Sequence, residues 1–545
     1  MYINKVTIKN FKSYKDQVSI KLNDGLNILV GNNETGKSTI LEAIHLALSG
    51  LSNGKYIKNE LSEYLFNQQS VSDYLESLKN KKPIPPPEIS IKIFITGENM
   101  SFFEGDGNSP NQNECCISLK IALDDSFRNE YNKYITGPVV SALPIEFYSV
   151  NWETCAREKI TPRTIPIKSA LIDSSSNRYK NGSDIYISHI IKNHLEVSHK
   201  NDLAQAHRKL QAAFLEDDAV IKVNQVIGGK GIDSKNVQLT IDLSSKDAWE
   251  HSFLTCVDDI PFHHIGKGEQ AIIKTKLALQ HKKTEEANII LLEEPENHLS
   301  HSKLNQLIRY IHDKCSTKQI LISTHSSFVA NKLGLKNLIL IANKSTLRLD
   351  DLNADTQEFF EKIPGYDTLR LILCKKAILV EGDCDELIVQ RAYMDANSGK
   401  MPIEDEVDVI SVGTSFLRFL EIADKISKEV CVVTDNDGKV PELKKKYSAY
   451  LGDNRKTNIK ICFDEVIDTG SLEIKGKKFN YNTLEPKFLK ENGLQKFKEI
   501  FDQDRTEEQW HIYMKANKTD CALKIFSSPA KLKYPKYILD AIEKK

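Results

Sequence analysis

The stretch from residue 25 to residue 50 constrains the fold more than any other part of this chain. The apolar run GLNILV leads into the loop GNNETGKST, and the helical pattern TILEAIHLALSG follows and closes at Gly50. Two glycines that frame four residues, followed by Lys and Ser, form the phosphate-loop pattern, here in the strand–loop–helix context that the pattern requires. We therefore expect an α/β domain with a phosphate-binding loop after a buried strand.

Backbone N–H groups of such a loop, together with the N-terminus of the next helix, can surround a phosphate group. Lys37 would reach the β- and γ-phosphates of ATP, and the hydroxyl of Ser38 would bind Mg²⁺. The residues expected to bind the nucleotide are Gly31, Asn32, Asn33, Glu34, Thr35, Gly36, Lys37, Ser38 and Thr39.

A second apolar strand, in ANIILLEEPENHLS, ends in Glu293 and Glu294. We assign Glu293 to the Mg²⁺ shell and Glu294 to the polarisation of the attacking water. The next strand, in LISTHSS, ends at His325, which could sense the γ-phosphate. A single histidine is usually structural, but its place after the paired glutamates favours a catalytic role.

Composition sets limits on the class of protein. The 74 Lys and Arg residues nearly balance 75 Asp and Glu residues, so any basic surface for nucleic acid must be local. The ten cysteines show no CxxC spacing, and we expect free thiols in a reducing cytosol. The N-terminus lacks the core of a signal peptide, and no apolar run approaches the roughly 20 residues that span a bilayer. We expect a soluble, cytoplasmic protein without a membrane partner.

The 545 residues are enough for two or three domains. We place the main boundary between residues 371 and 372, just before the run AILVEG that begins a second α/β series, and we expect the C-terminal tail from about residue 486 to be mostly helical. The stretch from about 170 to 225 is polar and helix-prone, and it predicts an inserted helical segment. It could serve as a dimerisation arm or simply pack on its own domain. A strand-like run, NVQLTIDL, follows.

Acidic residues crowd the ends of two strands in the second series. Glu381 follows the strand of KKAILVEGDCDELIV, and Asp435 and Asp437 follow the strand of VCVVTDNDG. In a parallel sheet such strand ends share one edge. Carboxylates gathered there require cations, and oxygen ligands suit Mg²⁺ or Mn²⁺. Two such ions roughly 4 Å apart can clamp a phosphodiester, so the pattern indicates phosphoryl transfer.

The first series resembles the head of ABC-type ATPases of the SMC and RecF kind. The resemblance rests on the order of the phosphate loop, the turn HIGKGEQ, the strand with paired glutamates and the strand before His325. It implies that the turn completes the nucleotide site of a second protomer, and Gly266 replaces the Ser expected at its first position. The turn residues implicated are Gly266, Gly268, Glu269 and Gln270.

The pair LVEG and DNDG resembles the Toprim domain, and an ABC-type head followed by Toprim resembles the OLD (overcoming lysogenisation defect) nucleases. The fold implied is α/β: an ATPase head with a helical insertion, then a Toprim domain with a parallel sheet. The resemblance also implies a two-metal nuclease centre. Its metal ligands would be Glu381, Asp385, Asp435, Asp437 and, from TLEP, Glu485. Glu386 would assist, and Lys518, or less favourably Lys515, would stabilise the scissile phosphate.

The function implied is DNA cleavage controlled by ATP, with one Mg²⁺ at the nucleotide and two Mg²⁺ or Mn²⁺ ions in the Toprim site. The resemblance implies a bacterial anti-phage effector that acts alone or with a defence-system partner protein or nucleic acid. A signature turn that acts on a second protomer implies a homodimer or tetramer. The alternative is a non-nucleolytic, RecF-like DNA-repair ATPase in which the acidic cluster is structural.

Overall fold

The fold is described from a computed structural model of the chain. The structure describes residues 1–52, 54–98, 100–107, 113–137, 140–173, 179–180, 183–184, 195–228, 237–241, 254–280, 284, 286–315, 317–326, 337–342, 345–348, 351–362 and 366–543. The chain divides into two compact units, one formed by residues 1–27 and 38–324 and the other by residues 28–37 and 325–545. The boundary expected between residues 371 and 372 stays a prediction.

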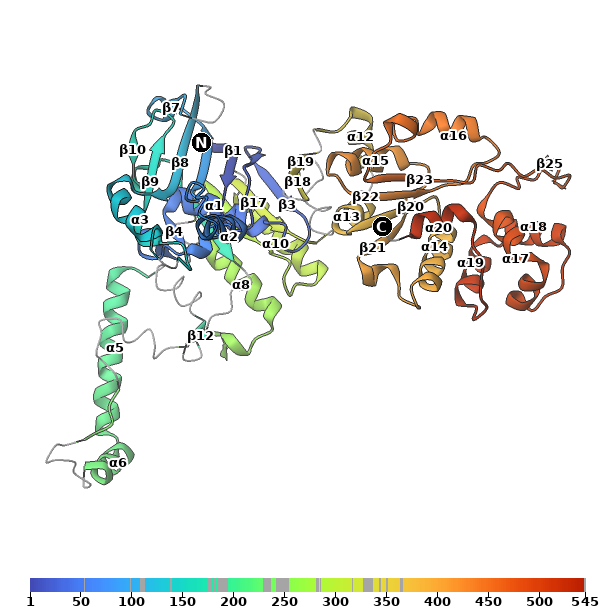
Figure 1. Cartoon of the computed structure of the whole chain (residues 1–545). Coiled ribbons are helices and arrows are strands. Elements are labelled where there is room, and N and C mark those ends of the chain that lie inside the picture. Colours follow the sequence, from blue (N-terminus) through green and yellow to red (C-terminus); the bar gives the residue numbers. More distant parts are fainter. Residues whose placement is uncertain are drawn as a thin grey trace. The chain divides into compact units, whose positions relative to one another are not determined.

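An antiparallel sheet forms one layer of the first unit (Figure 1). Its strands follow the order β10-β9-β8-β6-β1-β2, with β7 paired to β8. In β1 and β6 apolar and polar residues mostly alternate, because one face packs on the core. The strand bounds are β1 Tyr2–Lys9, β2 Val18–Lys21, β6 Ile89–Thr96, β7 Glu104–Gly105, β8 Glu114–Leu123, β9 Tyr148–Thr154 and β10 Lys159–Ile160.

The first unit also contains three parallel strands, β11 (Ser169–Asp173), β16 (Ile289–Glu293) and β17 (Gln319–Thr324). Residues of β17 are all buried, and so are those of β16 except the last. Asp173, Glu293 and Ser323 stand next to one another at the carboxyl ends. Other helices of this unit are α1 Lys37–Ser49, α2 Gln68–Lys79, α3 Arg128–Ile135, α8 Lys267–Gln280 and α10 His301–Cys315.

Two helices, α5 (Val197–Glu216) and α6 (Asp218–Gly228), form an arm within the stretch expected to be a helical insertion. The stretch begins instead with β11, and residues 174–178, 181–182 and 185–194 lie outside the described residues. The expected strand in NVQLTIDL is wrong for residues 237–241, which have no regular structure. The backbone of Leu239 forms hydrogen bonds with a side chain and not with a neighbouring strand. Its N–H donates to Oδ1 of Asn224 (2.7 Å), and its carbonyl accepts from Nδ2 of Asn224 (3.2 Å).

The expectation that all cysteines are free thiols is wrong for two of them. Cys116 and Cys155, separated by 39 residues, form a disulfide. Strands β8 and β9 pair with Ile117 opposite Thr154, so the next positions outward, Cys116 and Cys155, also face one another. Both cysteines pack with Phe94 in a small buried cluster. Strand register, which spacing along the sequence does not reveal, places the two sulfurs together.

A four-stranded sheet of order β21-β20-β22-β23 is the centre of the second unit, and all its neighbouring strands are parallel. Its strands are β20 Lys376–Val380, β21 Val407–Ser411, β22 Glu429–Val433 and β23 Ile459–Cys462. The central strands KAILV and EVCVV are buried after their first residue, as expected for parallel strands covered on both faces. This confirms the expected parallel sheet.

The same unit holds three more strands. Strand β3 (Leu26–Val30) pairs in parallel with β18 (Leu338–Ala342), and β18 pairs antiparallel with β19 (Ser345–Arg348).

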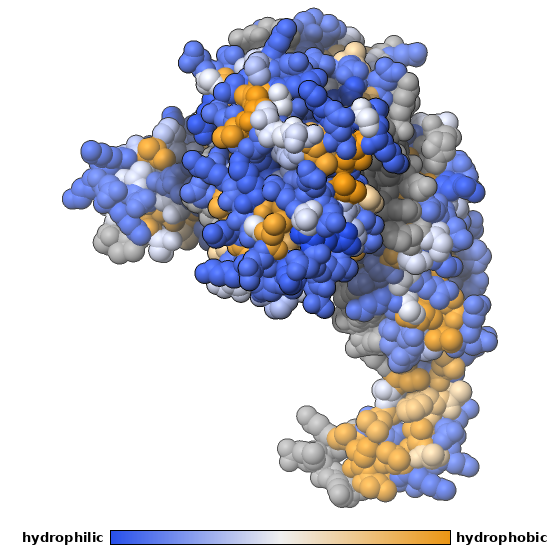
Figure 2. Space-filling model, turned by 90° about the vertical axis from the view of Figure 1, so that its right-hand side faces the viewer, coloured by the Kyte–Doolittle hydropathy of each residue, from blue (hydrophilic) through white to orange (hydrophobic). Residues whose placement is uncertain are grey.

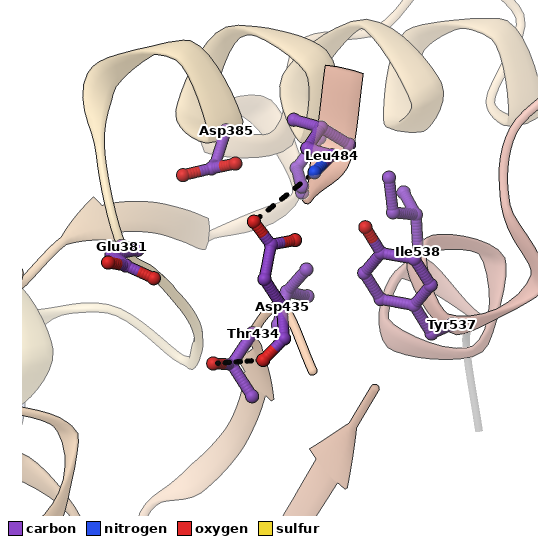
Figure 3. A pocket seen from close by; sticks show the side chains of 9 residues that line it. Glu381, Asp385, Thr434, Asp435, Leu484, Tyr537 and Ile538 are labelled. Carbon is purple, nitrogen blue, oxygen red and sulfur yellow. Dashed lines mark hydrogen bonds between the residues drawn. The ribbon is translucent and has the colours of Figure 1, made fainter. Parts of the chain in front are cut away.

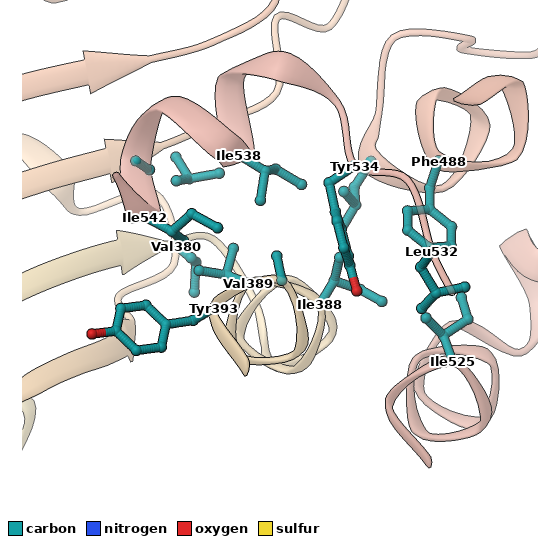
Figure 4. Packing of buried hydrophobic residues seen from close by; sticks show 14 of the residues in the cluster. Val380, Ile388, Val389, Tyr393, Phe488, Ile525, Leu532, Tyr534, Ile538 and Ile542 are labelled. Atoms are coloured by element: carbon teal, nitrogen blue, oxygen red, sulfur yellow. The ribbon is translucent and has the colours of Figure 1, made fainter. Parts of the chain in front are cut away.

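The C-terminal helices pack on this sheet through one hydrophobic core (Figure 4). Val389 of α14 and Ile538 of α20 lie against Val380 of β20, and Phe488 of α17 packs farther out. The helices of the unit are α12 Ala354–Lys362, α13 Tyr366–Leu373, α14 Asp383–Ala396, α15 Phe416–Lys425, α16 Val440–Lys446, α17 Leu484–Phe501, α18 Glu507–Ala516, α19 Lys518–Ser527 and α20 Lys536–Ile542. Across the described parts of the chain, none of the helices has the length and apolar character that crossing a membrane requires.

Candidate active site

Two adjacent parallel strands bring the main acidic residues to one sheet edge. Strands β20 and β22 pair with Leu379 opposite Val432. Glu381 directly follows β20, and Asp435 comes two residues after β22. Asp385 lies in the first turn of α14, which begins two residues after Glu381. Figure 3 shows these three carboxylates around one pocket, which Thr434, Leu484, Tyr537 and Ile538 also line.

Asp435 is held at the start of helix α17. Its Oδ2 accepts a hydrogen bond from the backbone N–H of Leu484, 3.2 Å away (Figure 3). Burial raises the pKa of Asp435 well above its usual value, and the nearby carboxylates of Asp385 and Glu485 raise it further. The protein therefore places this carboxylate where its negative charge is unfavourable unless a cation is bound.

Asp385 has the same electrostatic character. Its Oδ2 accepts a hydrogen bond from the N–H of Gly382 at 2.9 Å, which closes the first turn of α14. Burial raises the pKa of Asp385 to about 6, and the charges of Glu485 and Glu381 act in the same direction. The hydrogen bond from Gly382 and the charge of Lys518 oppose the rise without cancelling it.

Glu485 and Lys518 reach the site from two helices that follow much later in the chain. Nζ of Lys518, at the start of α19, lies 2.7 Å from Oε1 of Glu485. Burial by itself would lower the pKa of Lys518. The hydrogen bond to Glu485 and the charges of Glu485, Asp385 and Asp435 outweigh burial, so the pKa of Lys518 is raised. Nζ of Lys515, the alternative lysine, instead lies 5.7 Å from the ring centroid of Phe479. The structure thus places Lys518, rather than Lys515, among the carboxylates.

Two other acidic residues of the motifs have different surroundings. Asp437 is exposed and has a positive φ of 48°, and its Oδ1 accepts a hydrogen bond from Nδ2 of Asn480 at 2.8 Å. Glu386 lies 3.4 Å from Nη2 of Arg370, which also binds Asp408 at 2.8 Å. The carboxylate of Glu386 thus belongs to an ion pair beside the site, and its assistance in metal binding stays a prediction.

Divalent cations fit the donor chemistry of this pocket. Every candidate ligand is a carboxylate, which Mg²⁺ and Mn²⁺ prefer, and burial makes the negative charges of Asp385 and Asp435 unfavourable. Among the described residues, no three His, Cys, Asp or Glu side chains stand close enough to hold an ion in the arrangement shown. Binding would thus require the carboxylates to move toward the ion.

The sequence did not reveal the contribution of Tyr537, which follows Pro535 at the start of α20 and lines the pocket. Burial raises the pKa of Tyr537, and the charges of Asp435 and Asp385 add to the rise. The phenol of Tyr537 therefore stays neutral, and it lines the same pocket as the carboxylates. The sequence signal was the terminal segment YPKYILDAIE, but no spacing rule connects it with the end of β22, more than 100 residues earlier.

The phosphate loop lies between strand β3 and helix α1, which is the context that its sequence predicts. Nζ of Lys37 donates hydrogen bonds to the carbonyls of Gly31 and Asn32, each at 2.8 Å. A Cβ on Gly31 would lie 2.4 Å from the carbonyl oxygen of Ile341, so only glycine fits there. Gly36 has a φ of 98°, which also favours glycine. The Lys37 ammonium thus bonds its own loop at the position where nucleotide phosphates are expected.

The paired glutamates stand at the end of β16 as expected, since Glu293 is the last residue of the strand and Glu294 follows it. Glu293 accepts a hydrogen bond from Ser38, and burial raises the pKa of Glu293 despite that bond. The N–H of Glu294 donates to the carbonyl of Ser323 at 3.0 Å. Oε2 of Glu294 accepts a hydrogen bond from Nδ2 of Asn297 at 3.1 Å. His325 is exposed directly after β17.

The turn HIGKGEQ forms the start of helix α8. The N–H of Gln270 donates to the carbonyl of Gly266 at 3.0 Å, and Nε2 of Gln270 donates to that of Ile265, also at 3.0 Å. A Cβ on Gly268 would lie 2.5 Å from the carbonyl oxygen of His298, so the turn packs closely on the segment after the paired glutamates. That this turn completes the nucleotide site of a second protomer, through Gly266, Gly268, Glu269 and Gln270, stays a prediction.

Known proteins resemble both parts of the chain. Residues 2–346 match the RecF/RecN/SMC N terminal domain family, and residues 372–437 match the TOPRIM domain of overcoming lysogenization defect protein-like proteins. These two matches confirm the expected ABC-type ATPase head fold together with a Toprim domain.

Individual relatives differ in how much of the chain they cover. Endonuclease GajA of Bacillus cereus is 22% identical over 530 residues, which is 93% of this chain and 86% of that protein. DNA replication and repair protein RecF of Acetivibrio thermocellus is 40% identical over 84 residues, only 15% of this chain and 22% of RecF. The SMC head domain from Thermotoga maritima is 12% identical, with a TM-score of 0.31, over 64% of this chain and 97% of that one.

Proposed function

The chain belongs to the RecF/RecN/SMC N-terminal domain family and carries an OLD-like TOPRIM domain, and from this premise we propose that it is a nucleotide-regulated, divalent-metal-dependent DNA endonuclease. The observation that carries the proposal is the convergence of Asp385, Asp435, Glu485 and Lys518 from separate segments. The similarity to a protein named endonuclease GajA over 93% of the chain supports it.

The carboxylates and the lysine have complementary tasks in this proposal. Glu381, Asp385 and Asp435 would hold divalent cations at the pocket, with Asp437 and Glu485 at its margin. Such cations, when bound, activate a water molecule and stabilise the charge of the phosphodiester as it is cleaved. The ammonium of Lys518 would stabilise a non-bridging phosphate oxygen, once Glu485 has turned from Lys518 toward the cation. The neutral Tyr537 phenol could position a phosphate or a water molecule beside Asp435.

Control of cleavage by nucleotide would come from the ABC-type ATPase head. Lys37 would exchange its bonds to the loop carbonyls for bonds to the β- and γ-phosphates of ATP, and Ser38 with Glu293 would hold Mg²⁺. Glu294 would orient the attacking water, and His325 would contact the γ-phosphate. The GEQ turn, Gly266 to Gln270, would close over the nucleotide of a second protomer.

The helical arm supports the proposed homodimer or tetramer. Large apolar side chains on α5 and α6 are exposed, although such residues are usually buried. Figure 2 shows hydrophobic residues gathered at the end of this arm. The exposed residues are Val197, Leu210, Phe214, Ile221, Val223 and Val226. We extend the proposal to a role in defence against phages, with or without a partner protein, on the family resemblance alone.

Plasmid cleavage tests the proposal. The purified chain should nick or cut supercoiled DNA with Mg²⁺ or Mn²⁺, and ATP should change the rate. Asp435→Ala should abolish cleavage, whereas Asp383→Ala, which removes an exposed carboxylate from the first turn of α14, should retain it. A wild-type chain that cleaves no DNA with any metal, nucleotide or partner would support the alternative, a RecF-like ATPase without nuclease activity.

A further inference from the structure

A lysine-rich β-hairpin projects from the second unit and takes no part in the site described above. Strands β24 (Glu473–Ile474) and β25 (Lys477–Lys478) pair antiparallel, and the hairpin of β25 extends away from the sheet of its unit (Figure 1). The two turn residues, Lys475 and Gly476, have φ of 52° and 74°. Positive φ at both central residues is what a two-residue type I′ turn requires, so the turn fixes the direction of the hairpin tip.

The hairpin is a local concentration of positive charge. Residues 472–479 (LEIKGKKF) contain three lysines and one glutamate, whereas the whole chain has a formal net charge of −1. The side chains of Lys475, Lys477 and Lys478 are exposed. Within the described parts of the chain, none of these three lysines makes an ion pair or a side-chain hydrogen bond. Lysines that stabilise nothing inside the fold are available to an external anion.

The base of the hairpin is fixed next to the acidic site. Nδ2 of Asn480 donates to Oδ1 of Asp437 at 2.8 Å. Oδ1 of Asn482 accepts from the N–H of Asp468 at 2.7 Å, and Nδ2 of Asn482 donates to the carbonyl of Asp468 at 2.9 Å. Nδ2 of Asn436 donates to the carbonyl of Asp464 at 2.6 Å. Asn480, which follows β25, thus joins the end of the hairpin to the DNDG loop, and the bonds of Asn482 and Asn436 fix the segment that leads into the hairpin.

An aromatic cluster supports the same base. The ring centroids of Phe479 and Tyr481 lie 4.9 Å and 5.2 Å from that of the buried His511. The two rings flank Asn480 in sequence, so this packing holds the asparagine against Asp437. The hairpin is therefore a projecting element with a rigid attachment rather than a loose loop.

The length of the chain sets how far the lysines can reach. Lys478 precedes Asn480 by two residues and Lys475 precedes it by five, so their Cα atoms lie at most about 7 Å and 18 Å away. Each strand of a DNA duplex carries a phosphate about every 3.4 Å along the helix axis. The lysines thus lie within roughly five nucleotides of a phosphodiester placed at Asp437. Lys439, also exposed, follows Asp437 by two residues on the other side.

We propose that the hairpin Leu472–Phe479 binds the phosphate backbone of DNA beside the scissile bond and thereby positions the strand in the acidic pocket. The inference rests on the proposed nuclease function, because the pocket supplies the reason for a polyphosphate ligand at this place. Phosphate contacts of this kind carry no sequence information, so the hairpin would fix position and not sequence preference.

Binding measured without metal tests this inference separately from cleavage. The full chain with Lys475→Gln, Lys477→Gln and Lys478→Gln is titrated against fluorescein-labelled duplex DNA in EDTA between about 50 and 200 mM KCl, a range over which counterion release changes the affinity strongly. We expect binding at least roughly tenfold weaker and a slope of log K against log salt reduced by up to about 2.7, near 0.9 for each lost contact.

A matched control removes the same charge at the opposite edge of the sheet. Lys375, Lys400 and Lys425 are exposed on segments that lead into the amino ends of β20, β21 and β22. The control triple variant with Gln at these positions should bind DNA like the wild type. Equal loss in both variants, or unchanged affinity and slope in the hairpin variant, would overturn the inference.

Acetylation of lysines on the wild-type chain provides a measurement that needs no variant. Bound DNA should protect Lys475, Lys477 and Lys478 from an amine-reactive acetylating reagent, as read by mass spectrometry, and should leave the three control lysines reactive. Absence of protection at saturating DNA overturns the inference. Protection in a chain that never cleaves DNA would overturn the nuclease proposal and keep the hairpin as a DNA-binding element.

Discussion

The substitution Asp385→Asn should stabilise the metal-free protein at alkaline pH while it abolishes metal-dependent cleavage. Asparagine keeps an oxygen that can accept the hydrogen bond from Gly382, and it removes the negative charge that burial makes unfavourable. A residue that serves as a ligand for a cation is expected to destabilise the fold when the cation is absent. The prediction therefore separates a functional carboxylate from one that stabilises the structure.

The raised pKa of Asp385 gives the size of the stabilisation expected for Asp385→Asn. A pKa raised from 3.8 to about 6 contributes stability that is fully present below the ordinary pKa and is lost as the pH rises through about 6. At about 1.4 kcal/mol for each pKa unit, the loss reaches roughly 3 kcal/mol at pH 8, and about half of that at pH 5. Asp385→Asn should recover at most this amount. For a unit of this size, the melting temperature should rise by up to roughly 6 to 12 °C at pH 8.

Thermal unfolding in EDTA at pH 5 and pH 8 checks this magnitude. Asp383→Asn is the matched control, since Asp383 is exposed in the same helical turn, and it should change stability by less than about 0.5 kcal/mol. Mg²⁺ or Mn²⁺ should raise the melting temperature of the wild type at pH 8 but not that of Asp385→Asn. A lower melting temperature for Asp385→Asn at pH 8, or the same change at both pH values, would refute the reasoning.

Three further outcomes can be measured. Lys37→Ala should weaken binding of a fluorescent ATP analogue at least about tenfold, because it removes the ammonium that would bind the β- and γ-phosphates. Gly31→Ala should lower stability by about 1 to 3 kcal/mol in a thermal melt, since its Cβ would lie 2.4 Å from a backbone carbonyl oxygen, whereas Gly25→Ala, with nothing within 4 Å, should not. Lys518→Met should slow plasmid cleavage roughly 10²- to 10³-fold, and an equal effect of Lys515→Met would contradict the assignment of Lys518.

Local patterns in the sequence determined the elements that carry the chemistry. The phosphate loop, the glutamates at the end of β16 and the acids after β20 and β22 are each encoded within about ten residues. A buried strand followed by a polar turn is a local property, and parallel strands place their carboxyl ends at one edge. For that reason the sequence by itself predicts that Glu381 and Asp435 meet.

Only the tertiary structure decided which distant side chains join or leave that edge. Packing of α17 and α19 brings Glu485 and Lys518 together, whereas Arg370 draws Glu386 into an ion pair. Strand register alone pairs Cys116 with Cys155. Such contacts depend on how helices and strands far apart in the chain are packed, and spacing along the sequence carries almost no information about that packing.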